Sequence, residues 1–203
     1  SQFVGGRVGA ESLKVLLSMS QTRTAEVPLA ADHKIWEVHR RIPTPERIAE
    51  ARERIKGPPA HKDWVWAKET LLLDALIAKK RDVEVEVQAI QVGPVVCLSN
   101  PAEYFVSYGL QLKKRSGFPM TFPVELANGC VGYVPDEEAF GPHGGGYETR
   151  LTSYSNLEIT AGTQFMNVGL ELAAKMKPAK LPERPNGPIG KPWAYGDQPP
   201  QLK

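Results

Sequence analysis

The sequence predicts a mixed α/β fold, in which helices flank a mixed sheet. Over residues 83–89, valine and alanine alternate with glutamate and glutamine, which is the period of a strand with one buried and one wet face. The apolar run 95–98 follows a Gly93-Pro94 turn and completes a hairpin. Three segments have apolar residues at helical spacing and are expected to cover the sheet: 63–80, 104–115 and 161–176.

The chain before this hairpin predicts two further helices and an extended segment. Apolar residues at helical spacing predict a helix over 7–19. Residues 21–42 have the pattern of extended chain, and Pro28 restricts a strand there to the edge of a sheet. Thr44-Pro45 supplies an N-cap and a first helical residue, so a helix is expected from there to about Ile55.

The predicted helix 63–80 is the longest of the chain. Its buried face is expected to carry Trp64, Ala67, Leu71, Ala75 and Ala78, widened by Leu72 and Leu76. Trp64 and Trp66 are expected to anchor the helix to the body because they have the largest apolar surfaces nearby, and stacking on a ligand is the alternative.

The C-terminal half predicts one more strand and a tail. The strand is expected over 121–127, and residues 151–160 have the pattern of a loop or short strand. Residues 1–177 are assigned to the folded domain, and residues 178–203 to an extended Pro-rich tail. The tail has prolines at positions 178, 182, 185, 188, 192, 199 and 200, which exclude a helix or a central strand.

The composition excludes several classes of function. A net charge of +2 is too small to predict a nucleic-acid partner. The triplets Lys79-Lys80-Arg81 and Lys113-Lys114-Arg115 fall where helices are expected to end, where cations suit the helix dipole. No run approaches the ~18 apolar residues of a membrane helix. Cys97 and Cys130 do not form a CxxC pair, and free buried thiols are favoured over a disulfide.

The stretch Ala127–Arg150 is unusually rich in glycine. Glycine occurs there where backbone turns sharply or approaches another group closely. Tyr133 and Tyr147 lie within this stretch, which is either a surface loop packed down by its tyrosines or part of a site. Glu103 stands where an apolar strand gives way to a helix, so it either caps the helix or belongs to a site at the strand end.

These segments together resemble a known family. The strand ending in Pro101-Ala102-Glu103, the following helix, the motif LANGCVGYVP over 126–135 and GGYETR over 145–150 resemble the neutral/alkaline ceramidase superfamily, in its bacterial ceramidase-like branch. The resemblance covers roughly Trp64 to Met176. It implies that the chain is the C-terminal part of a larger ceramidase-like catalytic domain, and that Glu103 and Tyr133 are zinc ligands. It also implies that Tyr147 assists at the reacting carbonyl.

The sequence departs from the family at several positions. Ala102 replaces the usual glycine of the turn, and alanine is harder to hold at positive φ. Cys130 stands where tyrosine is frequent, and loop 141–146 has a different spacing. The family's zinc histidines have no counterpart: the chain's own histidines form no metal-binding motif, and His143 alone is a candidate ligand. They are His33, His39, His61 and His143.

A catalytic zinc site takes about three protein ligands and a water. The remaining Zn²⁺ ligands are therefore expected from an upstream segment or a partner chain, with Ser1 marking a cleavage or a separately encoded start. By resemblance, the whole would be an oligomeric amide hydrolase acting on a lipid-like substrate, secreted, periplasmic or at the cell surface. The alternative is a catalytically inactive structural or assembly subunit, whose tail, with Trp193 and Tyr195, wraps a partner.

Overall fold

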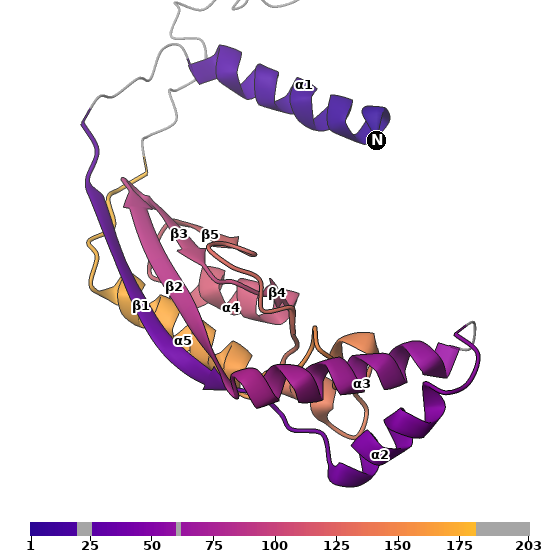
Figure 1. Ribbon diagram of the computed structural model, residues 1–203. Helices are drawn as coiled ribbons and strands as arrows, with labels where there is room; N and C mark the ends of the chain where they lie inside the picture. The colour runs from indigo at the N-terminus through magenta and orange to yellow at the C-terminus, as the bar shows by residue number, and fades with distance from the viewer. Residues whose placement is uncertain (20–25, 60–61, 182–203) are drawn as a thin grey trace, which may run out of the picture.

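The computed structural model describes residues 1–19, 26–59 and 62–181 and confirms a mixed α/β fold. Figure 1 shows a four-stranded sheet of order β1-β2-β3-β5. Strands β1, β2 and β3 are antiparallel, whereas β3 and β5 are parallel, so the sheet is mixed as predicted. The strands are β1 (Leu29–His39), β2 (Asp82–Val92), β3 (Val95–Ser99) and β5 (Met120–Val124).

A pair of helices is inserted between β1 and β2. Helices α2 (Pro45–Arg54) and α3 (Lys62–Lys79) pack on each other at the end of the sheet (Figure 1). The predicted N-cap is confirmed, because the Thr44 hydroxyl accepts a hydrogen bond from the Arg47 amide at 3.3 Å. Strand β1 is an edge strand, as Pro28 predicted.

One face of the sheet is covered by two helices, α4 (Val106–Arg115) and α5 (Ala161–Ala174). Side chains at alternate positions of β2 and β3 pack against these helices, so the buried face predicted for residues 83–89 of β2 is confirmed. The core beneath α5 includes Phe165, whose ring meets Trp36 edge-on with centroids 5.6 Å apart. Fully burying side chains of this size stabilises the fold by roughly 1.5–3 kcal/mol each. The buried strand residues are Val85, Val87, Ala89, Val96 and Leu98.

The opposite face of the sheet is apolar at one end and acidic at the other. Ile90, Val92 and Phe122 are 44–48% exposed there, and Glu84 and Glu86 follow along β2. Helix α1 (Gln2–Ser18) is set apart from the sheet and has no buried residue (Figure 1). Within the described residues, no helix is long and apolar enough to cross a membrane.

Three predicted boundaries shift. Helix α1 begins at Gln2 rather than at residue 7. Helix α4 begins at Val106 rather than at 104, because Glu103 and Tyr104 form a short strand. Strand β5 ends at Val124 rather than at 127, because the backbone turns where Leu126 and Asn128 adopt φ values of 52° and 59°.

The predicted buried face of α3 is confirmed only in part, at Ala67, with Leu71 and Leu76 half-buried. The structure buries Ala67, Thr70 and Leu73, whereas Leu72 is 46% exposed and Ala75 is exposed. Helix α2 packs on α3, and the segment after η3 also contacts α3, through Arg150 on Trp66 and Ser153 on Glu69. The positions of these neighbours, rather than the spacing of apolar residues, decide which side is covered.

The anchoring role predicted for the two tryptophans of α3 is confirmed. The Trp64 indole donates to the Ile55 carbonyl at 3.0 Å, and the Arg150 guanidinium lies 4.2 Å from the centroid of the Trp66 ring. In the tail, residues 182–203, including Trp193 and Tyr195, lie outside the described residues, as does His61.

Candidate functional site

Two short strands bring Glu103 and Tyr133 together. Strands β4 (Glu103–Tyr104) and β6 (Tyr133–Val134) pair in parallel, with Glu103 opposite Tyr133. The Glu103 amide donates to the Gly132 carbonyl at 2.9 Å. The two residues that the resemblance assigns as metal ligands are therefore neighbours across a strand pair.

The turn before Glu103 is built without backbone strain. The Asn100 side chain accepts the Ala102 amide at 3.0 Å, and the Pro101 carbonyl accepts the Val131 amide at 2.8 Å. Ala102 is fully buried and is not among the residues with positive φ. The turn therefore does not use the conformation that favours glycine, and alanine fits it. That its backbone differs from the glycine-containing turn of the family stays a prediction.

Gly132 allows a distant segment to approach the site. It has a φ of +79°, and a Cβ placed there would lie 1.7 Å from the Tyr154 carbonyl oxygen. The neighbouring Tyr133 amide donates to the same carbonyl at 3.0 Å. A glycine is thus required at this position for the Tyr154 segment to pack against β6.

Tyr154 is a site residue that the sequence did not reveal. Its hydroxyl donates to Glu103 Oε1 at 2.7 Å, and it lies 3.3 Å from the Cys130 sulfur. Its ring meets Tyr133 edge-on, with centroids 5.3 Å apart. The signal in the sequence is weak: a tyrosine within the polar run TSYSN, which has the composition of an ordinary loop.

That run is held in place from the end of β1. Arg41 donates to the carbonyls of Leu157 at 2.9 Å, Ser155 at 3.0 Å and Thr149 at 3.2 Å. Its guanidinium also lies 4.8 Å from the centroid of the Phe140 ring. Burial, with repulsion from Arg47, lowers the pKa of Arg41 to about 10. This arginine therefore fixes the backbone on both sides of Tyr154.

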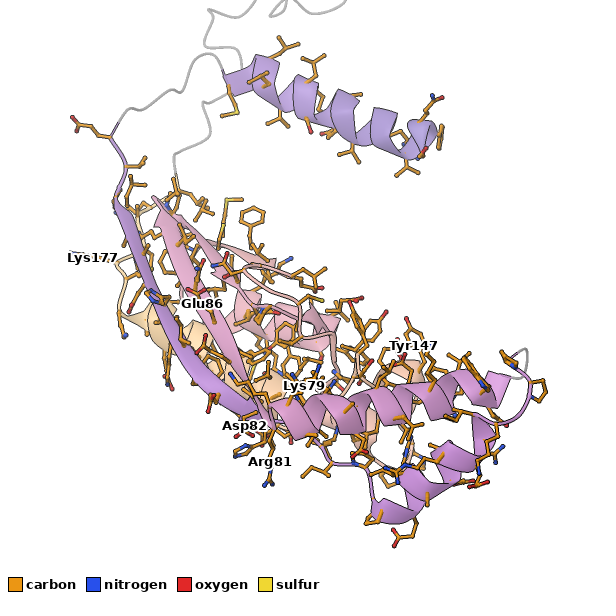
Figure 2. The ribbon with its side chains drawn as sticks, in the orientation of Figure 1. Lys79, Arg81, Asp82, Glu86, Tyr147 and Lys177 are labelled. Atoms are coloured by element: carbon orange, nitrogen blue, oxygen red, sulfur yellow. The ribbon has the colours of Figure 1, made fainter. Side chains whose placement is uncertain are left out.

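Tyr147 completes a cluster of three tyrosines. It begins the short 3₁₀ helix η3 (Tyr147–Thr149), after Gly146 with a φ of 96°. Its ring meets Tyr133 edge-on at 5.3 Å between centroids, and the side chain is 57% exposed (labelled in Figure 2). The Gly-rich stretch thus brings Tyr133 and Tyr147 into ring contact, and Tyr133 lies opposite Glu103. Both interpretations of the stretch, a packed surface loop and part of a site, agree with this contact.

The pKa values of Tyr133 and Tyr154 are raised above the ordinary tyrosine value. The hydrogen bond with Tyr147 raises the pKa of Tyr133 to about 12, and burial and the charge of Glu103 add to the effect. The pKa of Tyr154 is also raised, most by its hydrogen bond with Cys130 and next by its hydrogen bond with Glu103. At neutral pH these side chains are therefore neutral and can donate hydrogen bonds.

Glu103 and Tyr133 offer two oxygen donors, and Zn²⁺ accepts carboxylate oxygen. Across residues 1–19, 26–59 and 62–181, no group of three or more His, Cys, Asp and Glu side chains could hold a metal ion. His143 is exposed, and His39 bonds to Asp82 at 2.7 Å. Both cysteines are free, but Cys130 is exposed, so its expected burial is wrong. Zinc ligation by Glu103 and Tyr133 stays a prediction, and these two side chains are fewer than the three protein ligands that a catalytic zinc site needs.

Comparison with known proteins gives one distant likeness. No family model matches the chain, and no curated protein matches it. A solved structure described as "Ceramidase complexed with C2" matches with a TM-score of 0.39 and 16% sequence identity. The match covers 51% of this chain and only 17% of that chain. At this TM-score and identity, the likeness carries no argument about activity or about individual residues.

Proposed function

We propose that the chain forms part of a zinc-dependent hydrolase that cleaves an amide (N-acyl) bond. The observation that carries this proposal is the parallel β4–β6 pair, which sets Glu103 beside Tyr133. These are the residues for which the motif resemblance implies metal ligation. The contacts of Tyr147 and Tyr154 with Tyr133 support it further, because they surround the two donors with hydrogen-bonding groups.

Each side chain has a distinct role in this proposal. Glu103 and Tyr133 hold the metal, and the Tyr154 hydroxyl orients the Glu103 carboxylate. When bound, zinc activates a water for attack on a carbonyl. Because the pKa of Tyr133 is raised to about 12, ligation through its phenol must release a proton. The exposed Tyr147 hydroxyl donates a hydrogen bond to the oxyanion that develops on the substrate.

The proposal includes a second source of ligands. A catalytic zinc site needs about three protein ligands, and Glu103 and Tyr133 provide two. An upstream segment or partner chain supplies the others, and the site forms between the two.

Activity of the assembled protein tests this function. The chain is expressed in its host with a tag, and any co-purifying chain is identified by mass spectrometry. The assembly is expected to hydrolyse N-acyl amides, and Tyr147→Phe to lower kcat by about 10²-fold or more, since one oxyanion donor is lost. Hydrolysis that is unchanged in the Tyr147→Phe variant would contradict the role given to Tyr147, and an assembly without hydrolysis would contradict the function.

One observation favours the alternative, an inactive assembly subunit. Helix α1 exposes Phe3, Val8 and Leu17 by 64–76%, and the outer sheet face exposes Val92 and Phe122. Apolar surfaces of this kind mark contacts with other proteins. A stable assembly that contains no zinc and hydrolyses no amide would establish this alternative.

A further inference from the structure

A pocket lies between helices α2 and α3, and neither Glu103 nor Tyr133 lines it. It has a volume of about 510 Å³, within the range of small-molecule sites. Its walls come from α2, from α3 and from Arg150, which directly follows η3. The side chains on which the argument depends are Arg47, Glu50, Arg54, Asp63, Trp66 and Arg150.

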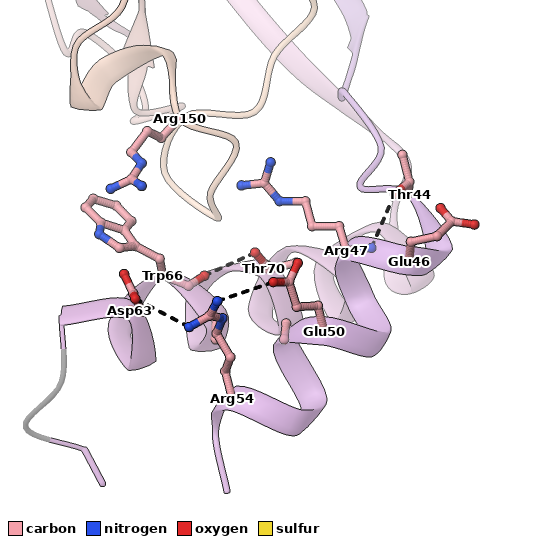
Figure 3. A pocket seen from close by; sticks show the side chains of 11 residues that line it. Thr44, Glu46, Arg47, Glu50, Arg54, Asp63, Trp66, Thr70 and Arg150 are labelled. Carbon is pink, nitrogen blue, oxygen red and sulfur yellow. Dashed lines mark hydrogen bonds and ion pairs between the residues drawn. The ribbon is translucent and has the colours of Figure 1, made fainter. Parts of the chain in front are cut away.

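The acidic side chains of the pocket are already engaged. Arg54 lies 3.4 Å from Glu50 and 3.4 Å from Asp63, so two carboxylates share one guanidinium on one side of the pocket (Figure 3). Glu46 lies in the first turn of α2, where hydrogen bonds from its own amide and from Thr44 lower its pKa. The carboxylates are thus occupied by one arginine and by the helix terminus.

Two arginines of the pocket have no acidic partner. Among the described residues, neither Arg47 nor Arg150 forms an ion pair. The Arg47 guanidinium donates to the Leu151 carbonyl at 3.4 Å, and the Arg150 guanidinium stacks on Trp66 with 4.2 Å to the ring centroid. Figure 3 shows both side chains reaching into the same space, Arg47 from α2 and Arg150 from the segment after η3.

A third arginine adds to the positive potential. Arg41 is bound to backbone carbonyls, and its repulsion with Arg47 contributes to its lowered pKa. The lining has as many carboxylates as arginines, but in the described part of the chain the guanidinium groups of Arg47 and Arg150 form no ion pair with those carboxylates. Guanidinium groups bind phosphate and carboxylate through paired hydrogen bonds. These hydrogen bonds are stronger where water is partly excluded.

We propose that this pocket binds an oxyanion, the phosphate or carboxylate group of a small ligand, between Arg47 and Arg150. The Trp66 ring, held by Arg150, provides the flat apolar wall against which the rest of the ligand lies. The proposal is independent of the zinc site, because neither Glu103 nor Tyr133 lines the pocket.

Titration with inorganic phosphate, phenyl phosphate and benzoate tests this site. The readout is the indole N–H signal of Trp66 in a ¹⁵N–¹H spectrum, assigned with Trp66→Phe. Saturable shifts are expected, with phenyl phosphate binding more tightly than inorganic phosphate because its ring meets Trp66. Removing one arginine is expected to weaken binding about tenfold, the size of one lost charge-assisted hydrogen bond.

The variants separate charge from folding. Arg47→Gln with Arg150→Gln is expected to abolish the shifts, and Arg47→Lys with Arg150→Lys to retain weak binding. Arg52→Gln is the matched control, since Arg52 lies on the same helix and pairs with Asp74 at 3.8 Å outside the pocket. If the double variant unfolds, Arg150→Gln alone is measured. The absence of saturable shifts in the native chain, or equal affinity in the glutamine variants, would overturn the proposal.

Discussion

The Tyr154 hydroxyl donates a hydrogen bond to Glu103 Oε1 over 2.7 Å. This contact joins the end of the core strands to a segment that packs against Gly132 and is fixed by Arg41. Because the Tyr154 ring also meets Tyr133, a single side chain touches both proposed metal ligands. The position of the Glu103 carboxylate therefore depends on the packing of residues 152–157.

Loss of the Tyr154 hydroxyl is expected to weaken metal binding without removing a ligand. In the assembled protein, Tyr154→Phe should lower zinc affinity by about 10-fold or more, as loss of a group that orients a metal ligand does. Competition with a chelator measures this affinity. Tyr108→Phe is the control, because it removes a hydroxyl that bonds to Thr163 instead. Equal zinc affinity in the native protein and Tyr154→Phe would show that Tyr154 does not position Glu103.

Alkaline pH is expected to reveal the hydrogen-bonded phenols. The pKa of Tyr133 is about 12 in the folded chain, against 10.0 for an ordinary tyrosine. The folded state therefore holds this proton more tightly, so its contribution to stability is complete below about pH 10 and is lost as the pH rises towards about 12. Ultraviolet titration should show a tyrosine that ionises late. Glu103→Gln should move this ionisation to lower pH, since it removes the neighbouring negative charge, and an unmoved titration would contradict that cause.

Substitution of Gly132 by alanine is expected to destabilise the fold by more than backbone strain at a positive φ alone would. Gly132→Ala should cost at least about 3 kcal/mol in the free energy of unfolding, because the new Cβ meets the Tyr154 carbonyl. Gly117 has a similar φ of +77° but open space around it, so Gly117→Ala should cost only about 1 kcal/mol. Urea unfolding of both variants separates backbone strain from collision. An equal loss in the free energy of unfolding for the two variants would show that the new Cβ at position 132 does not collide with the Tyr154 carbonyl.

Arg41 is expected to support the site from a distance. Lysine in its place keeps the charge but cannot reach three carbonyls in one geometry. Arg41→Lys should therefore cost about 2 kcal/mol and speed hydrogen exchange of the Tyr133 amide, which donates to Tyr154. The control is Arg52→Lys, at an exposed ion pair, where about 0.5 kcal/mol or less is expected. Unchanged hydrogen exchange of the Tyr133 amide in Arg41→Lys would show that Arg41 does not hold the Tyr154 segment against β6.

The sheet and its helices could be predicted because apolar residues recur in them at the spacing of a strand or of a helix. The alternation over β2 predicted its buried face, and Thr44-Pro45 predicted the start of α2. The buried face of α3 could be predicted only in part, because it depends on where its neighbours pack rather than on the spacing of apolar residues. Strands β4 and β6 are too short to show any period.

The candidate site could be predicted from the sequence only in part. The glycines predicted that Tyr133 and Tyr147 approach something closely, and the structure sets Tyr133 opposite Glu103 and the Tyr147 ring against Tyr133. The metal role of Glu103 and Tyr133 and the catalytic role of Tyr147 remain predictions. Tyr154 and Arg41 act through contacts between segments far apart in the chain, so no local pattern marks them.

Zinc content tests the central claim most directly, namely that Glu103 and Tyr133 are half of a metal site. The assembled protein is purified with native Glu103, with Glu103→Gln and with Glu138→Gln, which changes an exposed carboxylate on η2 (Glu137–Phe140). Bound zinc per chain is then measured by mass spectrometry after dialysis. The expected result is stoichiometric zinc in the native protein and in Glu138→Gln, and its loss in Glu103→Gln. A native assembly without zinc, or zinc unaffected by Glu103→Gln, would contradict it.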